Sequence, residues 1–256
     1  METMRLQDKV AIITGGAQGI GMSFALRFAR EGAKVVIADI NISAANNLVG
    51  ALVKEGKEAL AIKTDVSSLE DTKAMANKTV DAFGRIDILV NNAAMAGRVK
   101  MSKVSILELD PAEWDRLMAV NVKGCFLCSR AVLPWMMNQK SGKIINMASD
   151  TVFLPNPNML HYITSKGGVL TFTRALAKEV GDYNINVNCI APGSTFAEDP
   201  DNKEAIENRN APVSQRALKR VEYPEDITGT ALFLASSDSD FITGQSIVVN
   251  GGIVMH

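Results

Sequence analysis

The sequence predicts an α/β protein with a doubly wound parallel sheet and helices on both faces. Short apolar runs rich in β-branched residues alternate with longer helical patterns along all 256 residues. Most of these runs are apolar at consecutive positions, as expected for strands buried on both faces of a parallel sheet. Strand–helix–strand units of this kind connect through right-handed crossovers. No low-complexity linker or internal repeat divides the chain, so we expect a single domain over residues 1–256.

The expected elements alternate in order along the chain. Gly32 and Gly56 follow two apolar-periodic segments, and Asp110-Pro111 is typical of an N-cap followed by proline at the first helical position. The segment 194–222 contains no expected strand and is rich in charge. Because it follows a strand end, we expect a substrate lid there and not a solvated insertion. Strands are expected at residues 10–14, 34–38, 58–64, 86–91, 143–147, 186–190 and 246–249, and helices at 20–31, 43–55, 69–83, 111–138, 160–181 and 224–235.

Composition excludes several classes of protein. The net charge of −1 and the pI of about 6.2 provide no basic field for a nucleic-acid backbone. The sequence contains no run of 18 apolar residues and no apolar signal-peptide segment, so we expect a cytoplasmic protein without a membrane partner. Cys125 and Cys128 have metal-like spacing, but a structural zinc site needs four ligands, so we expect core cysteines and no metal.

A glycine-rich turn joins the first expected strand to the first helix. Residues 14–21 read Thr-Gly-Gly-Ala-Gln-Gly-Ile-Gly, and Gly15, Gly19 and Gly21 let the backbone approach a pyrophosphate without Cβ clashes. The second strand is followed by Asp39, whose carboxylate can accept hydrogen bonds from the adenosine ribose hydroxyls. Together these features predict a Rossmann-type dinucleotide site.

Polar residues follow the next two expected strands. Asp65-Val66 follows the third strand and Asn92 follows the fourth. Ligands bind at the carboxyl ends of strands in open α/β sheets. We therefore expect Asp65 and Val66 to contact the adenine, and Asn92 to lie near the second ribose.

A second group of residues is suited to proton transfer. Tyr162 and Lys166 lie four residues apart and so share one helical face. A phenol is a poor base at its ordinary pKa of about 10, and an ammonium about 4 Å away lowers that pKa towards neutral. We expect Tyr162 to be the general acid/base, Ser149 to hold the substrate oxygen, and Asn121 to anchor a water that relays protons from Lys166. His161 either touches the substrate or is an ordinary hydrogen-bonded histidine.

With these motifs in place, the chain resembles the short-chain dehydrogenase/reductase family over nearly its whole length. The resemblance implies the strand order 3-2-1-4-5-6-7 in a seven-stranded sheet, hydride transfer with a nicotinamide nucleotide, and a homotetramer assembled through the long helices and the last strand. It is carried by the residues at 14–21, 65–66 and 91–94, by Asn121, Ser149, Tyr162 and Lys166, and by Pro192-Gly193, Gly244-Gln245-Ser246 and Asn250-Gly251-Gly252.

Two positions depart from the family pattern. The usual Asn-Asn-Ala-Gly reads Asn91-Asn92-Ala93-Ala94, which adds one methyl group near the cofactor. Many members carry a nicotinamide-binding threonine two positions after Thr195, so we assign that contact to Ser194 or Thr195. The expected cofactor is NAD, held by Gly15, Gln18, Gly19, Ile20, Gly21, Asp39, Asp65, Val66, Asn92, Tyr162, Lys166, Pro192, Gly193, Ser194 and Thr195.

The sequence therefore predicts an NAD(H)-dependent oxidoreductase that interconverts a small secondary alcohol and a ketone. A 3-oxoacyl-thioester reductase is the alternative within the family, although such enzymes usually pair NADPH with basic residues near the glycine turn, and Gly16 and Ile40 are not basic. A non-catalytic nucleotide sensor is the alternative from another class. The substrate pocket is expected to include Met95, Ala96, Ser149, Thr151, Val152, Phe153, Tyr162 and Phe196.

Overall fold

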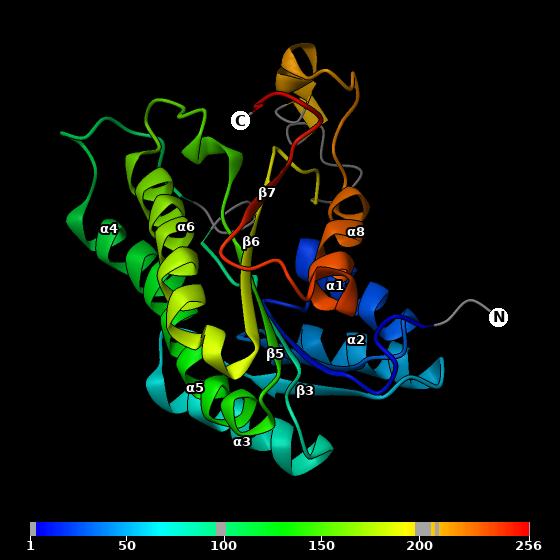
Figure 1. The fold of residues 1–256 in the computed structure, drawn as a ribbon. Helices are drawn as coiled ribbons and strands as arrows, with labels where there is room; N and C mark the ends of the chain where they lie inside the picture. Colours follow the sequence, from blue (N-terminus) through cyan, green and yellow to red (C-terminus); the bar gives the residue numbers. More distant parts are fainter. Residues whose placement is uncertain (1–3, 96–100, 198–205, 208–209, 256) are drawn as a thin grey trace.

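The computed structural model, which describes residues 4–95, 101–197, 206–207 and 210–255, confirms the doubly wound parallel sheet (Figure 1). Its strands lie in the order β3-β2-β1-β4-β5-β6-β7, as the family resemblance implied. Each neighbouring pair is parallel. The strands are β1 (Val10–Thr14), β2 (Lys34–Asp39), β3 (Ala59–Lys63), β4 (Ile88–Asn91), β5 (Gly142–Met147), β6 (Ile185–Pro192) and β7 (Ser246–Val249).

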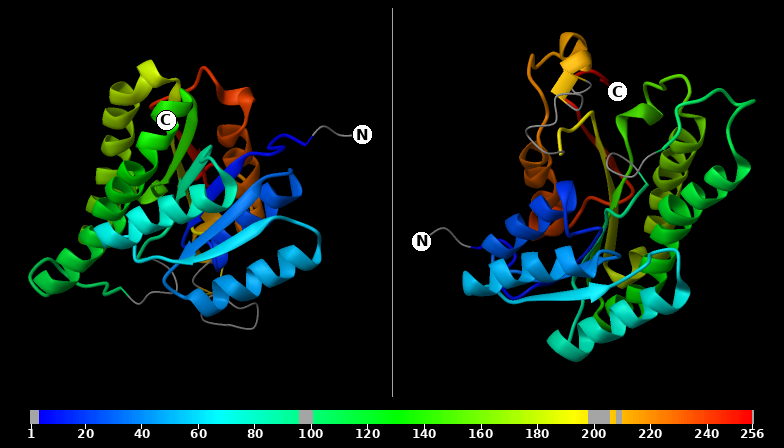
Figure 2. Two further views of the ribbon diagram at one scale, coloured as in Figure 1. Left: turned by 90° about the horizontal axis from the view of Figure 1, so that it is seen from below. Right: turned by 180° about the vertical axis from the view of Figure 1, so that it is seen from behind.

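Helices cover both faces of the sheet (Figures 1 and 2). One layer contains α1 (Gly19–Arg30), α2 (Ile42–Lys54) and α8 (Pro224–Ala235), and the other contains α3 (Leu69–Phe83), α4 (Pro111–Met118), α5 (Gly124–Gln139) and α6 (Leu160–Val180). The short helices are η1 (Ala119–Lys123), η2 (Asp150–Val152), η3 (Gly181–Tyr183), η4 (Ala211–Gln215) and η5 (Ser237–Ser239).

Alternate residues of the central strands form two separate cores. On β1, Ile13 packs in the cluster that includes Phe24 and Phe28 of α1, whereas Ile12 packs in the cluster that includes Val132 of α5. Successive side chains of a strand point to opposite faces of the sheet. This alternation explains why the strands read as continuous apolar runs in the sequence.

The expected helix at 111–138 is interrupted. The structure divides this run into α4, a π-helical turn at Ala119–Lys123, and α5. Cys125 Sγ, in the first turn of α5, donates a hydrogen bond to the carbonyl of Asn121 in the π-turn over 3.2 Å. Single π-turns inside α-helices are frequent at functional sites, and this one contains Asn121.

The run Pro111–Gln139 is also long and apolar enough to cross a membrane when length and composition alone are considered. In the fold, α5 packs on α3, β4 and β5, and seven of its residues are buried, among them Leu127, Val132 and Met136. Part of the apolar character of this run therefore comes from packing within the protein.

The strand after α6 is longer than expected. It was predicted at 186–190, but β6 extends through Pro192, because Pro192 pairs with Val249 of β7. The added residues carry the chain to the carboxyl edge of the sheet. Apart from the interrupted helix, the remaining strand and helix ends agree with expectation to within two residues.

The predicted lid at 194–222 is only partly described, because residues 198–205 and 208–209 lie outside the described residues. Its later part stands above the carboxyl ends of β6 and β7, beside the C-terminal segment (orange and red in Figure 1). Leu218 N donates to Gly251 O over 2.9 Å, and Thr195 forms an isolated parallel bridge with Glu222. The second half of the lid is thereby anchored to the segment after β7 and to the first residues of the lid itself.

Candidate active site

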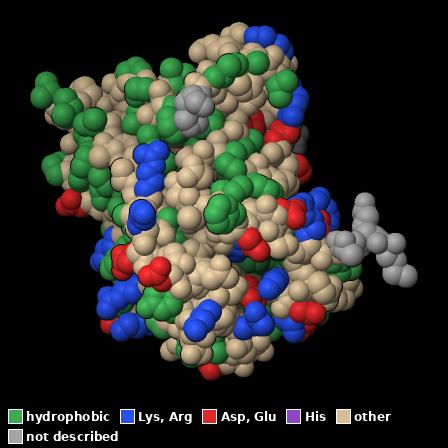
Figure 3. Space-filling view, viewed as in Figure 1, with side chains coloured by type: hydrophobic (Ala, Val, Ile, Leu, Met, Phe, Trp, Pro, Cys, Tyr) green, Lys and Arg blue, Asp and Glu red, His purple; other side chains and the backbone are tan. Residues whose placement is uncertain are grey.

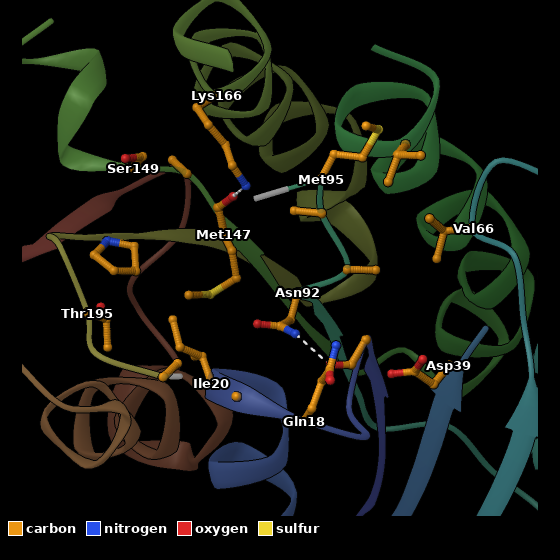
Figure 4. A pocket seen from close by; sticks show the side chains of 18 of the residues that line it. Gln18, Ile20, Asp39, Val66, Asn92, Met95, Met147, Ser149, Lys166 and Thr195 are labelled. Carbon is orange, nitrogen blue, oxygen red and sulfur yellow. Dashed lines mark hydrogen bonds between the residues drawn. The ribbon is translucent and has the colours of Figure 1, made fainter. Parts of the chain in front are cut away.

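A cavity of about 440 Å³ opens at the carboxyl ends of the strands, where the cofactor motifs were expected to meet (Figure 4). Asp39 and Val66 lie at one end, and Ser149, Lys166 and Thr195 lie at the other. Of the predicted cofactor and catalytic residues, the lining includes Gly15, Gln18, Gly19, Ile20, Asp39, Asp65, Val66, Asn92, Ser149, Tyr162, Lys166, Pro192, Gly193 and Thr195.

The glycine turn requires glycine for its backbone conformation and for close packing within the protein. Gly15 adopts φ +61°, and a Cβ there would lie 2.9 Å from the Cα of Ala93. Gly21 does not line the cavity; a Cβ at this position would collide with the carbonyl of Gly15. No side-chain hydrogen bond caps α1, whose N-terminus provides N–H groups and a positive dipole end suited to an anion.

Asp39 ends β2 and is held in place by two backbone amides. Its Oδ2 accepts a hydrogen bond from Ala17 N at 3.0 Å, and its Oδ1 accepts one from Asn41 N at 2.9 Å. The side chain lines the cavity although the residue is only 8% exposed. Each carboxylate oxygen can accept a further bond, so the carboxylate can still receive ribose hydroxyl protons.

Asn92 and Asp65 support the neighbouring turns as well as lining the cavity. Asn92 Nδ2 donates to the carbonyls of Thr14 and Gly15, each over 3.0 Å, and so ties the end of β4 to the glycine turn. Asp65 Oδ1 accepts hydrogen bonds from the amide and the hydroxyl of Ser67 at 2.9 and 2.7 Å. Both side chains are therefore fixed in orientation before any ligand binds.

Tyr162 and Lys166 lie together on α6, as their spacing predicted. Lys166 is only 4% exposed, and its Nζ donates to the carbonyl of Met147 over 2.7 Å. The same ammonium lies 5.8 Å from the centre of the Tyr162 ring. The pair thus forms one wall of the cavity, with the cation beside the phenol.

Ser149 follows β5 and is oriented by its neighbour. Its Oγ accepts hydrogen bonds from the Thr151 amide at 3.3 Å and from the Thr151 hydroxyl at 2.9 Å. Since its oxygen already accepts these two bonds, the Ser149 proton is left to be donated. Thr151, which was predicted to touch the substrate, is outside the lining and instead orients Ser149.

Asn121 lies behind the wall of the cavity. Its Oδ1 accepts from Met95 N at 2.8 Å, and its Nδ2 donates to Ser165 Oγ at 3.0 Å. It therefore links the segment after β4 to α6, which carries Tyr162 and Lys166. The proton relay assigned to Asn121 stays a prediction.

The segment after β6 places Thr195, and not Ser194, in the lining of the cavity. The carbonyl of Ser194 accepts a hydrogen bond from Arg216 over 3.0 Å. Phe196 stacks edge-on against Tyr223, and Phe153 packs against an apolar cluster that includes Cys125 and Ala148. Neither phenylalanine lines the cavity in this structure. Ala96 lies outside the described residues.

Three charged residues near the catalytic end were missed by the sequence analysis. Glu222 and Arg216 are 5% and 2% exposed, and Arg216 Nη2 lies 3.4 Å from Glu222 Oε2. Burial raises the pKa of Glu222 to about 7; the hydrogen bond from Thr195 and the charge of Arg216 oppose this effect, whereas the charge of Asp150 adds to it. Burial also raises the pKa of Asp150. In the sequence these residues belong to a charged segment and a turn, and nothing in that pattern indicates that they are buried.

His161 and the three cysteines, which the sequence offered as possible ligands or substrate contacts, have structural roles. His161 is buried, and its Nε2 lies 3.3 Å from Glu113 Oε1, so it is a hydrogen-bonded histidine outside the cavity lining. The cysteines are free and buried, and burial raises the pKa of the Cys189 thiol to about 11. Within the described part of the chain, no three His, Cys, Asp or Glu side chains gather to hold a metal ion.

Comparison with known proteins is consistent with this geometry. A family model described as "Enoyl-(Acyl carrier protein) reductase" matches residues 15–254. The chain is 41% identical to (2S)-[(R)-hydroxy(phenyl)methyl]succinyl-CoA dehydrogenase subunit BbsD of Thauera aromatica, over 97% of this chain and 98% of that protein. It is 39% identical to 3-oxoacyl-[acyl-carrier-protein] reductase FabG of Thermotoga maritima, over 98% and 100%. A crystal structure of a putative short-chain alcohol dehydrogenase from Sinorhizobium meliloti superposes with a TM-score of 0.90 at 31% identity and covers 98% of both chains.

Proposed function

The chain belongs to the short-chain dehydrogenase/reductase family, and on that premise we propose that it is an NAD(H)-dependent oxidoreductase that interconverts a secondary alcohol and a ketone. One observation carries the proposal. A single cavity joins Asp39, which suits the adenosine ribose, to Ser149, Tyr162 and Lys166, which suit a reacting carbonyl.

The residues present fit a nicotinamide dinucleotide. Gly15 and Gly19 line the cavity at the start of α1, where backbone N–H groups and the helix dipole would suit a pyrophosphate. Asp39 would receive the adenosine ribose, and Asp65 and Val66 line the same end of the cavity. Held by these residues, a nicotinamide dinucleotide would supply hydride transfer to or from the alcohol or ketone carbon.

The side chains supply the proton chemistry and the orientation. Ser149, whose oxygen already accepts from Thr151, donates its proton to the substrate oxygen. Tyr162 transfers a proton to or from that oxygen, and the ammonium of Lys166 lies 5.8 Å from the centre of its ring. Lys166 is kept beside Tyr162 by its hydrogen bond to Met147 O. Protons then pass to solvent by a route that we assign to Lys166 and Asn121.

The charge around Asp39 supports NAD(H) over NADP(H). Among the described lining residues Lys166 is the only lysine or arginine, and it lies at the opposite end of the cavity. Gln18 and Ile40, which line the adenosine end, are uncharged. A 2′-phosphate would therefore meet the Asp39 carboxylate at an end of the cavity where the described lining contains no lysine or arginine.

The walls around the catalytic residues favour an uncharged substrate. Met95, Val120, Met147, Ala148 and Ala197 line the cavity with apolar side chains. A charged group placed against such walls would lose hydration without gaining a partner. We therefore propose an alicyclic, aryl or alkyl alcohol or ketone as the substrate. We also propose a cytoplasmic location for the enzyme.

A 3-oxoacyl-thioester reductase is the second candidate, and the names of two relatives favour it. One is a reductase of 3-oxoacyl groups on acyl carrier protein, and the other is a dehydrogenase of a hydroxy(phenyl)methyl group on a succinyl-CoA thioester. Each name describes an oxo or hydroxy group on an acyl thioester. In that case the apolar walls would hold the acyl chain near the reacting carbon, and the thioester carrier would lie outside the cavity.

The test is an absorbance assay at the nicotinamide band. The panel contains simple secondary alcohols and ketones together with 3-oxoacyl-CoA and 3-hydroxyacyl-CoA thioesters, each with NAD(H) and NADP(H). Turnover of simple alcohols or ketones with NAD(H) is expected. Turnover of the thioesters alone would select the second candidate. Tight NADH binding without turnover of any compound would instead indicate a nucleotide sensor.

A further inference from the structure

The 193–195 turn is contacted at three consecutive residues by the segment 216–222. Glu222 Oε2 occupies the space beside Gly193, because a Cβ on that glycine would lie 2.7 Å from it. Arg216 Nη2 donates to the carbonyl of Ser194 over 3.0 Å. Thr195 Oγ1 donates to Glu222 Oε1 over 2.9 Å. We refer to this set of contacts as the Glu222 clamp.

The backbone strengthens the same attachment. Thr195 and Glu222 form a parallel β-bridge, and Phe196 N donates to Glu222 O over 2.8 Å. Arg216 is itself fixed, because its Nη1 donates to Arg220 O over 3.0 Å. The clamp therefore joins two segments of the chain through both main-chain and side-chain bonds.

The clamp is also tied to the catalytic side of the cavity. Asp150 follows Ser149, and Asn250 Nδ2 donates to Asp150 Oδ2 over 3.3 Å. The Cβ of Asn250 packs on the same side of Gly193 as Glu222, 2.8 Å from where a glycine Cβ would be. The turn therefore packs against both Glu222 and Asn250, next to the catalytic serine segment.

The hydrogen bond to Glu222 also decides what Thr195 offers to a ligand. A hydroxyl has one proton and two acceptor lone pairs. The proton of Thr195 is directed to Glu222, with a longer contact of 3.3 Å to Gly193 O. Towards the cavity, which Thr195 lines, its oxygen therefore presents an acceptor. The carboxamide NH₂ of a nicotinamide is a donor of matching polarity.

We propose that Glu222, supported by Arg216, is a positioning residue that holds the 193–195 turn and fixes the Thr195 hydroxyl as an acceptor for the nicotinamide carboxamide. The inference rests on the proposed use of a nicotinamide cofactor. Glu222 lies outside the cavity lining and acts through Thr195. The segment 216–222 thereby controls the nicotinamide end of the site, whereas the adenosine end depends on Asp39 and the glycine turn.

The test compares two probes that differ by the nicotinamide group. NADH contains the nicotinamide ring, and ADP-ribose lacks it. A substitution in the Glu222 clamp should therefore weaken the binding of NADH and leave the binding of ADP-ribose nearly unchanged. In Glu222→Ala we expect the Kd for NADH, measured by nicotinamide fluorescence, to rise roughly 10-fold, as for the loss of one hydrogen bond. The Kd for ADP-ribose, measured by calorimetry, should change by less than about 2-fold.

Two further variants assign the effect to the Thr195 bond. Thr195→Val should raise the Kd for NADH to a similar extent. The double variant with Glu222→Ala and Thr195→Val should bind NADH no more weakly than either single variant, because the two side chains act through one hydrogen bond. Glu222→Gln keeps the Oε1 acceptor and should retain NADH affinity within about 3-fold. The matched control is Arg220→Gln. Arg220 lies in the segment 216–222, and the substitution removes its exposed ion pair with Asp226 of α8. The affinities for NADH and for ADP-ribose should both stay unchanged.

If Glu222→Ala bound NADH and ADP-ribose equally more weakly than the wild-type protein, or bound both with unchanged affinity, the proposal would be overturned. If Glu222→Ala does not fold, Thr195→Val serves in its place and the same two outcomes would overturn it. The binding measurements need no substrate. A wild-type protein that binds NADH but turns over no compound of the panel would therefore refute the proposed reaction and leave this test intact.

Discussion

At the scale of single residues, the proposed chemistry depends most on Tyr162. Its ring lies beside the Lys166 ammonium and lines the cavity next to Ser149. We expect Tyr162→Phe to lower kcat by at least about 10²-fold, because general acid/base catalysis contributes typically that much or more. The Kd for NADH should stay within a few-fold, since the ring remains.

The measurement is steady-state kinetics with the best compound of the panel, together with fluorescence titration of NADH. Lys166→Ala is the matched comparison. Because the family resemblance also places Lys166 on the nicotinamide ribose, this variant should lose both turnover and NADH affinity. Near-wild-type turnover in Tyr162→Phe would rule out the phenol as the proton donor.

Single residues also show where sequence reasoning reaches its limit. Asp39, Tyr162 and Lys166 were predicted from short local patterns, and each lines the cavity. Glu222 was not predicted, because its contact with Thr195 joins positions 27 residues apart. A carboxylate in a charged segment reads as solvated, and only the folded chain shows that it is buried.

At the scale of elements, the burial of Glu222 makes the anchoring of the segment 216–222 dependent on pH. The pKa of this carboxyl rises from an ordinary value near 4.5 to about 7 on folding. The folded state therefore binds its proton more tightly than the unfolded state between these values. The contribution of Glu222 to stability is present below about pH 4.5 and is lost as the pH rises through about 7.

We expect Glu222→Gln to remove this dependence. Between pH 5 and pH 8 the wild-type protein should lose up to about 3 kcal/mol of unfolding free energy relative to the variant. Urea denaturation of both proteins at several pH values measures the difference, in which the other titrating groups cancel. Parallel pH profiles for the two proteins would show that Glu222 does not titrate in this range.

The elements themselves were largely predictable, with one exception at the site. Strands such as β1 and β2 are continuous apolar runs because both faces are buried, and this pattern is visible in the sequence. The π-turn at Ala119–Lys123 was not predicted, because its residues continue an ordinary helical pattern. It accompanies the tertiary hydrogen bonds of Asn121 to Met95 and Ser165, which no local pattern encodes.

At the scale of the whole molecule, we expect exposed apolar side chains to form subunit contacts in the tetramer that the family resemblance implies. Figure 3 shows hydrophobic side chains gathered on the side of the molecule where α4 and α6 lie. Phe126 and Trp135 of α5 are exposed, and Phe241, shortly before β7, is fully exposed. Patches of this kind on a soluble protein mark interaction surfaces.

We predict a particle of four chains of 27.5 kDa each in solution. Light scattering coupled to gel filtration gives the mass directly. Phe126→Asp should reduce it to a smaller assembly, because a charge would be buried in the helix interface, whereas Glu55→Gln on the exposed end of α2 should not. A monomeric wild-type protein would contradict the prediction.

We propose that one cavity joins an NAD(H)-selective ribose site to a Tyr–Lys proton donor. A 2′-phosphate near Asp39 would cost about 3 kcal/mol per charge at 5 Å and an effective dielectric of 20, reduced severalfold by water and salt. Loss of the ribose hydrogen bonds adds about 1.5–3 kcal/mol. The sum corresponds to a preference of roughly 10²- to 10³-fold for NAD(H).

The most direct measurement is therefore the ratio of kcat/KM for NADH and NADPH with one ketone, in the wild-type protein and in Asp39→Ser. The ratio of kcat/KM for NADH to that for NADPH should lie near 10²–10³ in the wild-type protein. Asp39→Ser should lower this ratio with little change in kcat. Equal use of NADPH and NADH by the wild-type protein would contradict the assignment of Asp39 as the residue that selects NAD(H).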